Sequence, residues 1–121
     1  MIPKIISADD HVIEPAHVWQ DRMPKKHKEH APKIVIAPQG EMTLNDGVWL
    51  ETPGKGDKMA AWWHFENKRY QIKQMVACPG IPPEEVTMEG VTYADIATGC
   101  YDPKARLADM DINHVEASLC F

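Results

Sequence analysis

The sequence predicts an α/β fold with parallel strands, and two segments carry that prediction. Residues 4–9 are mostly small or apolar and follow Pro3, which is typical of a short strand buried in a parallel sheet. Near the other end, Asp102 and Pro103 provide the cap and first residue of a helix, and residues 115–121 form an apolar strand. A helix that leads directly into a buried strand is half of a βαβ unit, which joins parallel strands.

Between these segments the sequence predicts a short helix and then a mostly β region. Pro15 begins a short helical stretch that ends before Pro24, and a charged, solvated run of Lys, His and Glu follows. Apolar runs separated by turn residues then predict a small meander and a second hairpin, because Asp-Gly between apolar runs is a hairpin signal. The expected strands are 34–36, 42–44, 48–50, 62–65 and 69–72. Residues 53–58 and 77–100 are rich in Gly and Pro and have no periodic apolar face.

Composition excludes several classes of function. The net charge is −5 and 26% of residues are charged, so there is no basic patch for nucleic acid or anionic lipid. Apolar runs are far shorter than the roughly 20 residues that span a bilayer, and the start of the chain lacks the apolar region of a signal peptide. The three cysteines, Cys78, Cys100 and Cys120, form neither a disulfide framework nor a zinc knuckle, so we expect a cytoplasmic protein.

Asp9 and His11 are the main candidates for chemistry. They lie two residues apart at the end of the first predicted strand, where side chains at i and i+2 point the same way. A carboxylate and an imidazole that converge are half of a site for a divalent metal such as zinc or manganese. The spacing alone also fits a strand-end turn with a capping Asp.

A longer set of motifs covers nearly the whole chain. The motifs lie at residues 9–15, 19, 22–24, 61–66, 99–103, 105–111 and 115–121. The strings Asp-x-His-x-x-Glu-Pro and Arg-Leu-x-Asp-Met-Asp among them are fairly specific. Together they resemble the amidohydrolase-2 family, the branch of the amidohydrolase superfamily with the ACMSD-like decarboxylases.

The resemblance implies a metal-dependent hydrolase or non-oxidative decarboxylase that acts on small carboxylic, including aromatic, acids. Members are (β/α)8 TIM barrels roughly three times this length, with one zinc or manganese ion. We therefore expect residues 1–121 to be the N-terminal part of an incomplete barrel, with residues 34–76 as a β-hairpin insertion. Asp9 and His11 would be the first-strand metal ligands, although the family more often has His or Glu at the position of Asp9. The remaining ligands, a His and an Asp, would lie beyond Phe121, so the chain alone should be inactive.

The other candidates have structural alternatives. Glu14 is expected to contact a small-molecule substrate, or else to fix the turn before Pro15. Arg106 and Asp109 form an i, i+3 helix pair. The Trp62–Trp63 pair lines a substrate pocket or a subunit contact, or packs the hairpin by default.

Two alternative functions stay open. One is a non-catalytic subunit of a split barrel, or a truncated product, whose partner is a complementing C-terminal chain or a second copy. The other is a small β-rich binding module built on residues 34–72.

Overall fold

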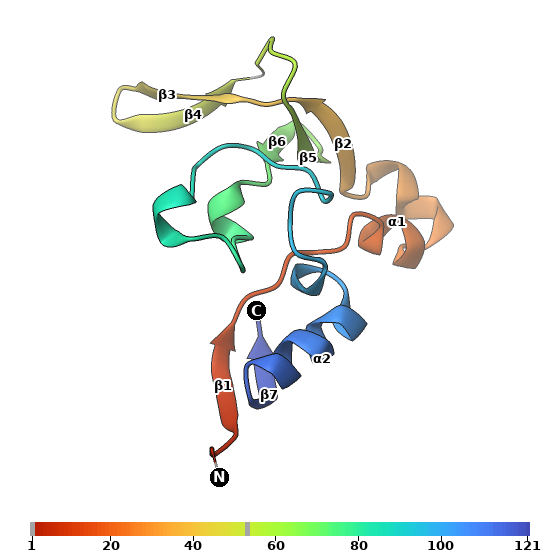
Figure 1. Ribbon diagram of the computed structural model, residues 1–121. Helices are drawn as coiled ribbons and strands as arrows, with labels where there is room; N and C mark the ends of the chain where they lie inside the picture. The colour runs from red at the N-terminus through yellow and green to blue at the C-terminus, as the bar shows by residue number, and fades with distance from the viewer. Residues whose placement is uncertain (1, 53) are drawn as a thin grey trace.

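The computed structural model describes residues 2–52 and 54–121, and Figure 1 shows how they are arranged. Strands predominate, with two α-helices and several short 3-10 helices between them. In chain order the elements are β1 (Ile5–Asp10), α1 (Val18–Arg22), η1 (Lys25–His30), β2 (Lys33–Pro38), β3 (Glu41–Asn45), β4 (Val48–Thr52), β5 (Met59–Phe65), β6 (Lys68–Gln71), η2 (Gln74–Val76), η3 (Pro83–Glu85), η4 (Thr98–Cys100), α2 (Pro103–Ile112) and β7 (Val115–Cys120).

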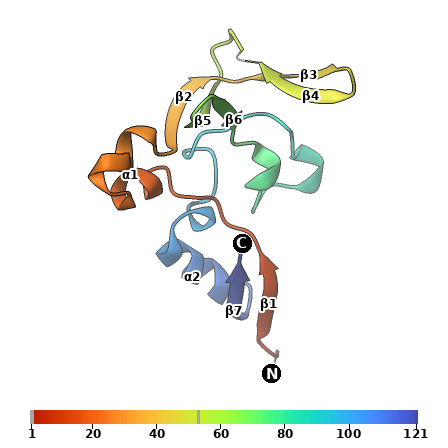
Figure 2. The same ribbon diagram turned by 180° about the vertical axis from the view of Figure 1, so that it is seen from behind.

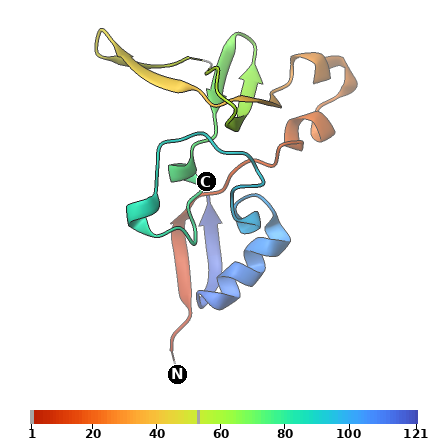
Figure 3. The same ribbon diagram turned by 45° about the horizontal axis from the view of Figure 1, so that its top comes forward.

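The described strands form three separate sheets. Strands β1 and β7 make a parallel pair beside α2 at one end of the molecule. At the other end lies the antiparallel sheet β2-β5-β6, and the β3–β4 hairpin projects beyond it. Figure 2 shows the same two ends from behind. In Figure 3 the segment 77–97 runs between them.

The prediction of a (β/α)8 barrel fragment is wrong. Such a fragment would alternate strands and helices around one parallel sheet, but five of the seven described strands lie in antiparallel sheets. Two-residue turns at residues 46–47 and 66–67 explain the difference, because a connection that short joins only antiparallel strands. Asp46, Gly47 and Glu66 take the positive φ angles that such tight turns need. The described residues therefore form a small β-rich domain.

Several individual elements nevertheless lie where the sequence predicts them. The first strand, the last helix and the last strand are present, and the Asp102 carboxylate caps α2 by accepting hydrogen bonds from two backbone amides. One strand pairing differs from the prediction. The sequence predicts a meander from 34 to 50, whereas β2 pairs with β5, with Ile36 opposite Ala61. That residues 34–76 are an insertion in a larger domain stays a prediction.

The apolar core is centred on one face of the β5–β6 hairpin. Ala61, Trp63 and Ile72 are buried there, and Ile13 packs against them from the segment after β1. The irregular segment 77–100 completes the core with the buried side chains of Ala77, Val91, Ile96 and Cys100. This contribution cannot be predicted from the sequence, because single apolar side chains in a loop form no periodic pattern.

A polar cluster holds the β3–β4 hairpin against the other face of β6. The buried Gln71 side chain accepts a hydrogen bond from the Gly40 amide (2.9 Å) and donates one to the Gly40 carbonyl (3.3 Å). Glu51 accepts a hydrogen bond from the Gln71 amide at 3.2 Å and pairs with Lys73. Both side chains of that ion pair are largely buried, with 14% and 20% exposed.

The parallel pair and α2, by contrast, leave large apolar side chains in solvent. Ile6 is 75% exposed, Leu119 59% and Ile112 76%. Within the described residues, no helix has the length and apolar character needed to cross a membrane.

Candidate metal site at the end of the parallel strands

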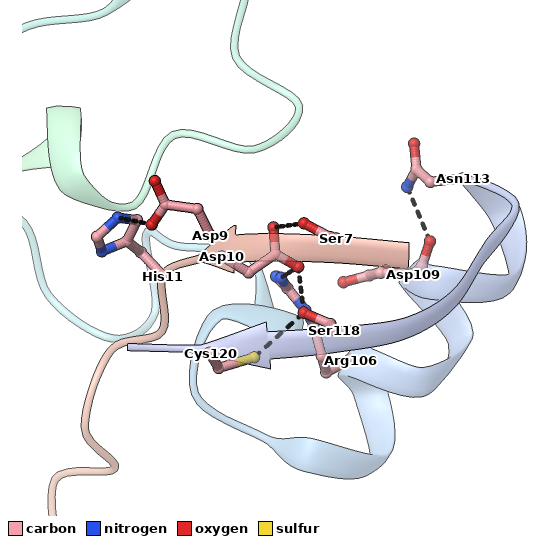
Figure 4. Close-up of polar contacts among 9 residues, drawn as sticks. All are labelled: Ser7, Asp9, Asp10, His11, Arg106, Asp109, Asn113, Ser118 and Cys120. Carbon is pink, nitrogen blue, oxygen red and sulfur yellow. Dashed lines mark hydrogen bonds and ion pairs between the residues drawn. The ribbon is translucent and has the colours of Figure 1, made fainter. Parts of the chain in front are cut away.

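Asp9 and His11 come together at the carboxyl end of β1, as their spacing predicts. Asp9 Oδ1 lies 3.5 Å from His11 Nε2, and the side chains are 83% and 75% exposed. Figure 4 shows both side chains on the same side of the strand end. Neither side chain has a hydrogen bond or ion pair with any other described residue, so both are available to a ligand from solvent.

Asp10 lies between them in the chain, at an irregularity in the register of β1 and β7, and its side chain contacts β7 and α2 instead. Its carboxylate accepts hydrogen bonds from Ser7 Oγ (2.8 Å), Ser118 Oγ and Arg106 Nη2 (2.9 Å), as Figure 4 shows. The hydrogen bonds from Ser118 and Ser7, with the Arg106 guanidinium, hold the pKa of Asp10 below its ordinary value. The cluster joins β1, β7 and α2 under the Asp9–His11 pair.

The sequence interpretation missed this cluster and paired Arg106 with the wrong partner. Arg106 forms its ion pair with Asp10, 96 residues earlier in the chain, rather than with Asp109 on its own helix. The adjacent acids Asp9 and Asp10 do predict that one carboxylate lies on each side of the strand, since neighbouring strand residues face opposite sides. The partner on the second side could not be identified without the fold.

Backbone hydrogen bonds continue the parallel pairing past the end of β1 and fix the position of His11. The Phe121 amide donates to the Asp10 carbonyl (2.8 Å), and the Val12 amide donates to the Phe121 carbonyl (3.0 Å). The rings of His11 and Phe121 lie 6.4 Å apart. The amide of Ile13 then donates to the Cys100 carbonyl at 2.7 Å. The segment that carries His11 is thus held on both sides by backbone contacts.

Glu14 lies further along this segment, at a cavity separate from the Asp9–His11 pair. Its carbonyl accepts a hydrogen bond from Tyr93 Oη at 2.6 Å. Burial, with the negative charge of Glu14 and the nearby Tyr101 and Tyr70, raises the pKa of Tyr93 to about 12. No hydrogen bond or ion pair joins the Glu14 carboxylate to Asp9 or His11. Its predicted contact with a substrate stays a prediction.

The pair does not form a complete metal site by itself. Across residues 2–52 and 54–121, no three side chains of His, Cys, Asp or Glu gather closely enough to hold a metal ion. Catalytic zinc sites ordinarily have three protein ligands. Any metal centre built on Asp9 and His11 therefore needs at least one further ligand.

No family model matches this chain, and no curated protein matches it either.

Proposed function

We propose that this chain contributes Asp9 and His11 to the metal centre of a metal-dependent hydrolase or non-oxidative decarboxylase. The substrate class is small carboxylic acids, including aromatic ones, and the metal is zinc or manganese. The enzyme class and the substrate class rest on the resemblance of the sequence motifs. The pairing of the two side chains rests on their geometry.

The separation of the two donor atoms is the observation that carries the proposal. Ligands bound at about 2.0–2.2 Å to a tetrahedral zinc ion lie roughly 3.3–3.5 Å apart. Asp9 Oδ1 and His11 Nε2 are 3.5 Å apart. The separation of the two donor atoms therefore fits a metal ion bound by both. The Asp10–Arg106 ion pair would keep the strand end in the orientation that brings these donors together.

A divalent metal held there would supply a Lewis acid that activates water or orients a substrate carboxylate. With only two protein ligands, we expect the isolated chain to bind metal weakly and to show no turnover. Glu14, the predicted substrate contact, would accept a hydrogen bond from a substrate hydroxyl group. The same carboxylate would repel a substrate carboxylate.

The proposal is tested by mapping metal binding on the full chain with paramagnetic Mn²⁺. In NMR spectra, low concentrations of Mn²⁺ should broaden the resonances of residues 8–12 before all others. Asp9→Asn and His11→Gln should each remove this effect. His27→Gln changes an exposed histidine on η1 and should leave the broadening in place. Broadening centred elsewhere, or unchanged in the two site variants, would overturn the proposal.

Activity gives a second measurement. The isolated chain, with zinc or manganese added, should not decarboxylate hydroxybenzoates. Robust turnover that is lost in Asp9→Ala and in His11→Ala would show that the chain is a complete enzyme. That result would contradict the claim that the metal site is incomplete in this chain. It would still support Asp9 and His11 as metal ligands.

A second candidate function is that of a non-catalytic subunit, and the exposed apolar surface of the parallel pair favours it. Ile6 and Leu119 on the two strands, and Ile112 at the end of α2, are exposed, and exposed apolar surface marks contact sites between proteins. A sheet of two strands also leaves open edges that can pair with another strand. The partner would be a complementing chain or a second copy. Sedimentation of the chain over a wide concentration range tests this, and a stable, cooperatively folding monomer would argue against it.

The proposed compartment is the cytoplasm. All three cysteines are free thiols in the structure, which suits a reducing environment. Localisation of the tagged protein in intact cells would check the assignment, and recovery from an oxidising compartment would contradict it.

A further inference from the structure

A small cavity lies between the β5–β6 hairpin and the segment that follows β1. It has a volume of about 240 Å³, and its lining includes Ile13, Glu14, Trp63, Tyr70, Ile72 and Lys73. An engineered apolar cavity of about 150 Å³ is large enough to hold benzene. This cavity therefore has room for one aromatic ring and a short side arm.

The walls of the cavity are fixed by the fold. Trp63 and Tyr70 are directly opposite each other on β5 and β6, so both side chains lie on the same face of the hairpin. Ile72 follows on that face, and its amide bonds to the Ala61 carbonyl at 2.9 Å. On the other side, the bond between Tyr93 Oη and the Glu14 carbonyl holds the segment after β1 in place.

The charge at the cavity is negative and uncompensated. Lys73, the one cation among the lining residues, pairs with Glu51 in a largely buried ion pair. The Glu14 carboxylate has no hydrogen bond or ion pair with any described residue. Its charge adds to the burial that raises the pKa of Tyr70, which indicates that the carboxylate and the phenol are close. A positive group placed at Glu14 would supply the partner that this carboxylate lacks among the described residues.

We propose that this cavity binds a small aromatic ammonium ion, with the ring against Trp63, Tyr70 and Ile72 and the ammonium group at Glu14. The two aromatic walls would pack against the ring of the ligand, and the Glu14 carboxylate would pair with its charge. A carboxylic acid would meet the Glu14 charge with no free cation to oppose it. The site is thus distinct in charge preference from the acid substrates proposed above, and it does not depend on a metal.

Benzylamine is the probe, and benzyl alcohol is its neutral counterpart of nearly the same shape. Titration calorimetry on the full chain should give a millimolar-range affinity for benzylamine that exceeds the affinity for benzyl alcohol. NMR shifts on addition of benzylamine should concentrate at Ile13, Tyr70 and Ile72. Glu14→Gln should weaken benzylamine binding about two- to fivefold, the range for a partly exposed ion pair. It should change benzyl alcohol binding less, because the glutamine oxygen still accepts a hydrogen bond from the hydroxyl group.

Glu84→Gln is the matched control, because Glu84 is an exposed acid on η3 that does not line the cavity. It should bind benzylamine as the unaltered chain does. Since Glu14 is itself exposed, its substitution should not disturb folding, which thermal unfolding will verify. Equal binding of the two probes, tighter binding of benzoate, shifts away from the cavity, or no effect of Glu14→Gln would each overturn the proposal.

Discussion

Replacing Gln71 with leucine should destabilise the protein by about 2–3 kcal/mol. The Gln71 side chain is only 5% exposed and makes two hydrogen bonds to the backbone of Gly40. Leucine would fill a similar volume but would leave the amide and the carbonyl of Gly40 without partners. Each unsatisfied buried group costs about 1–3 kcal/mol, and Gly40 is only half-buried, so the lower part of that range applies to both groups.

Urea unfolding followed by tryptophan fluorescence measures this loss. The midpoint should fall while the dependence of the unfolding free energy on urea stays the same, because the surface exposed on unfolding hardly changes. In a thermal scan the Tm should drop by roughly 6–12 °C. Gln39→Leu is the matched control, since the Gln39 side chain makes one long hydrogen bond, 3.5 Å to the Gly90 carbonyl. Its cost should stay below about 1 kcal/mol.

A loss of less than about 0.5 kcal/mol for Gln71→Leu, equal to that of the control, would refute the reasoning. It would mean that water reaches Gly40 and replaces the side chain. The β3–β4 hairpin would then be held by the Glu51–Lys73 ion pair and the Glu51 contact to the β6 backbone instead.

Two further predictions concern the same end of the molecule. Burial and two neighbouring cations hold the pKa of His64 below its ordinary value of 6.5. As the pH falls, His64 is therefore protonated in the unfolded chain before it is protonated in the folded chain. The free energy of unfolding should consequently be highest above pH 6.5 and should decrease toward pH 5. His64→Gln should flatten that decline in unfolding measurements, and His27→Gln should not. In Gly54→Ala the new Cβ would collide with the carbonyl oxygen of Gln39, so thermal unfolding should show a loss of about 1–3 kcal/mol. Gly56→Ala, which has open space around it, should be neutral; equal effects of the two alanines would contradict the packing.

The sequence by itself determined the local features of this protein. The alternation of side chains along a strand brings Asp9 and His11 together. The Asp46–Gly47 dipeptide predicts the tight turn between β3 and β4, because both residues readily take positive φ angles. The Asp102 cap and Pro103 define the start of α2. Each of these depends on neighbours within about three residues.

The tertiary structure decided everything that depends on residues far apart in the chain. The choice of β5 as the partner of β2, the ion pair between Asp10 and Arg106, and the clamp of Gln71 on Gly40 all join distant segments. Hydrophobic pattern and turn chemistry are the same for many such pairings. Only the packing of the whole chain selects one of them, whereas the short turns at residues 46–47 and 66–67 are what make the two hairpins antiparallel.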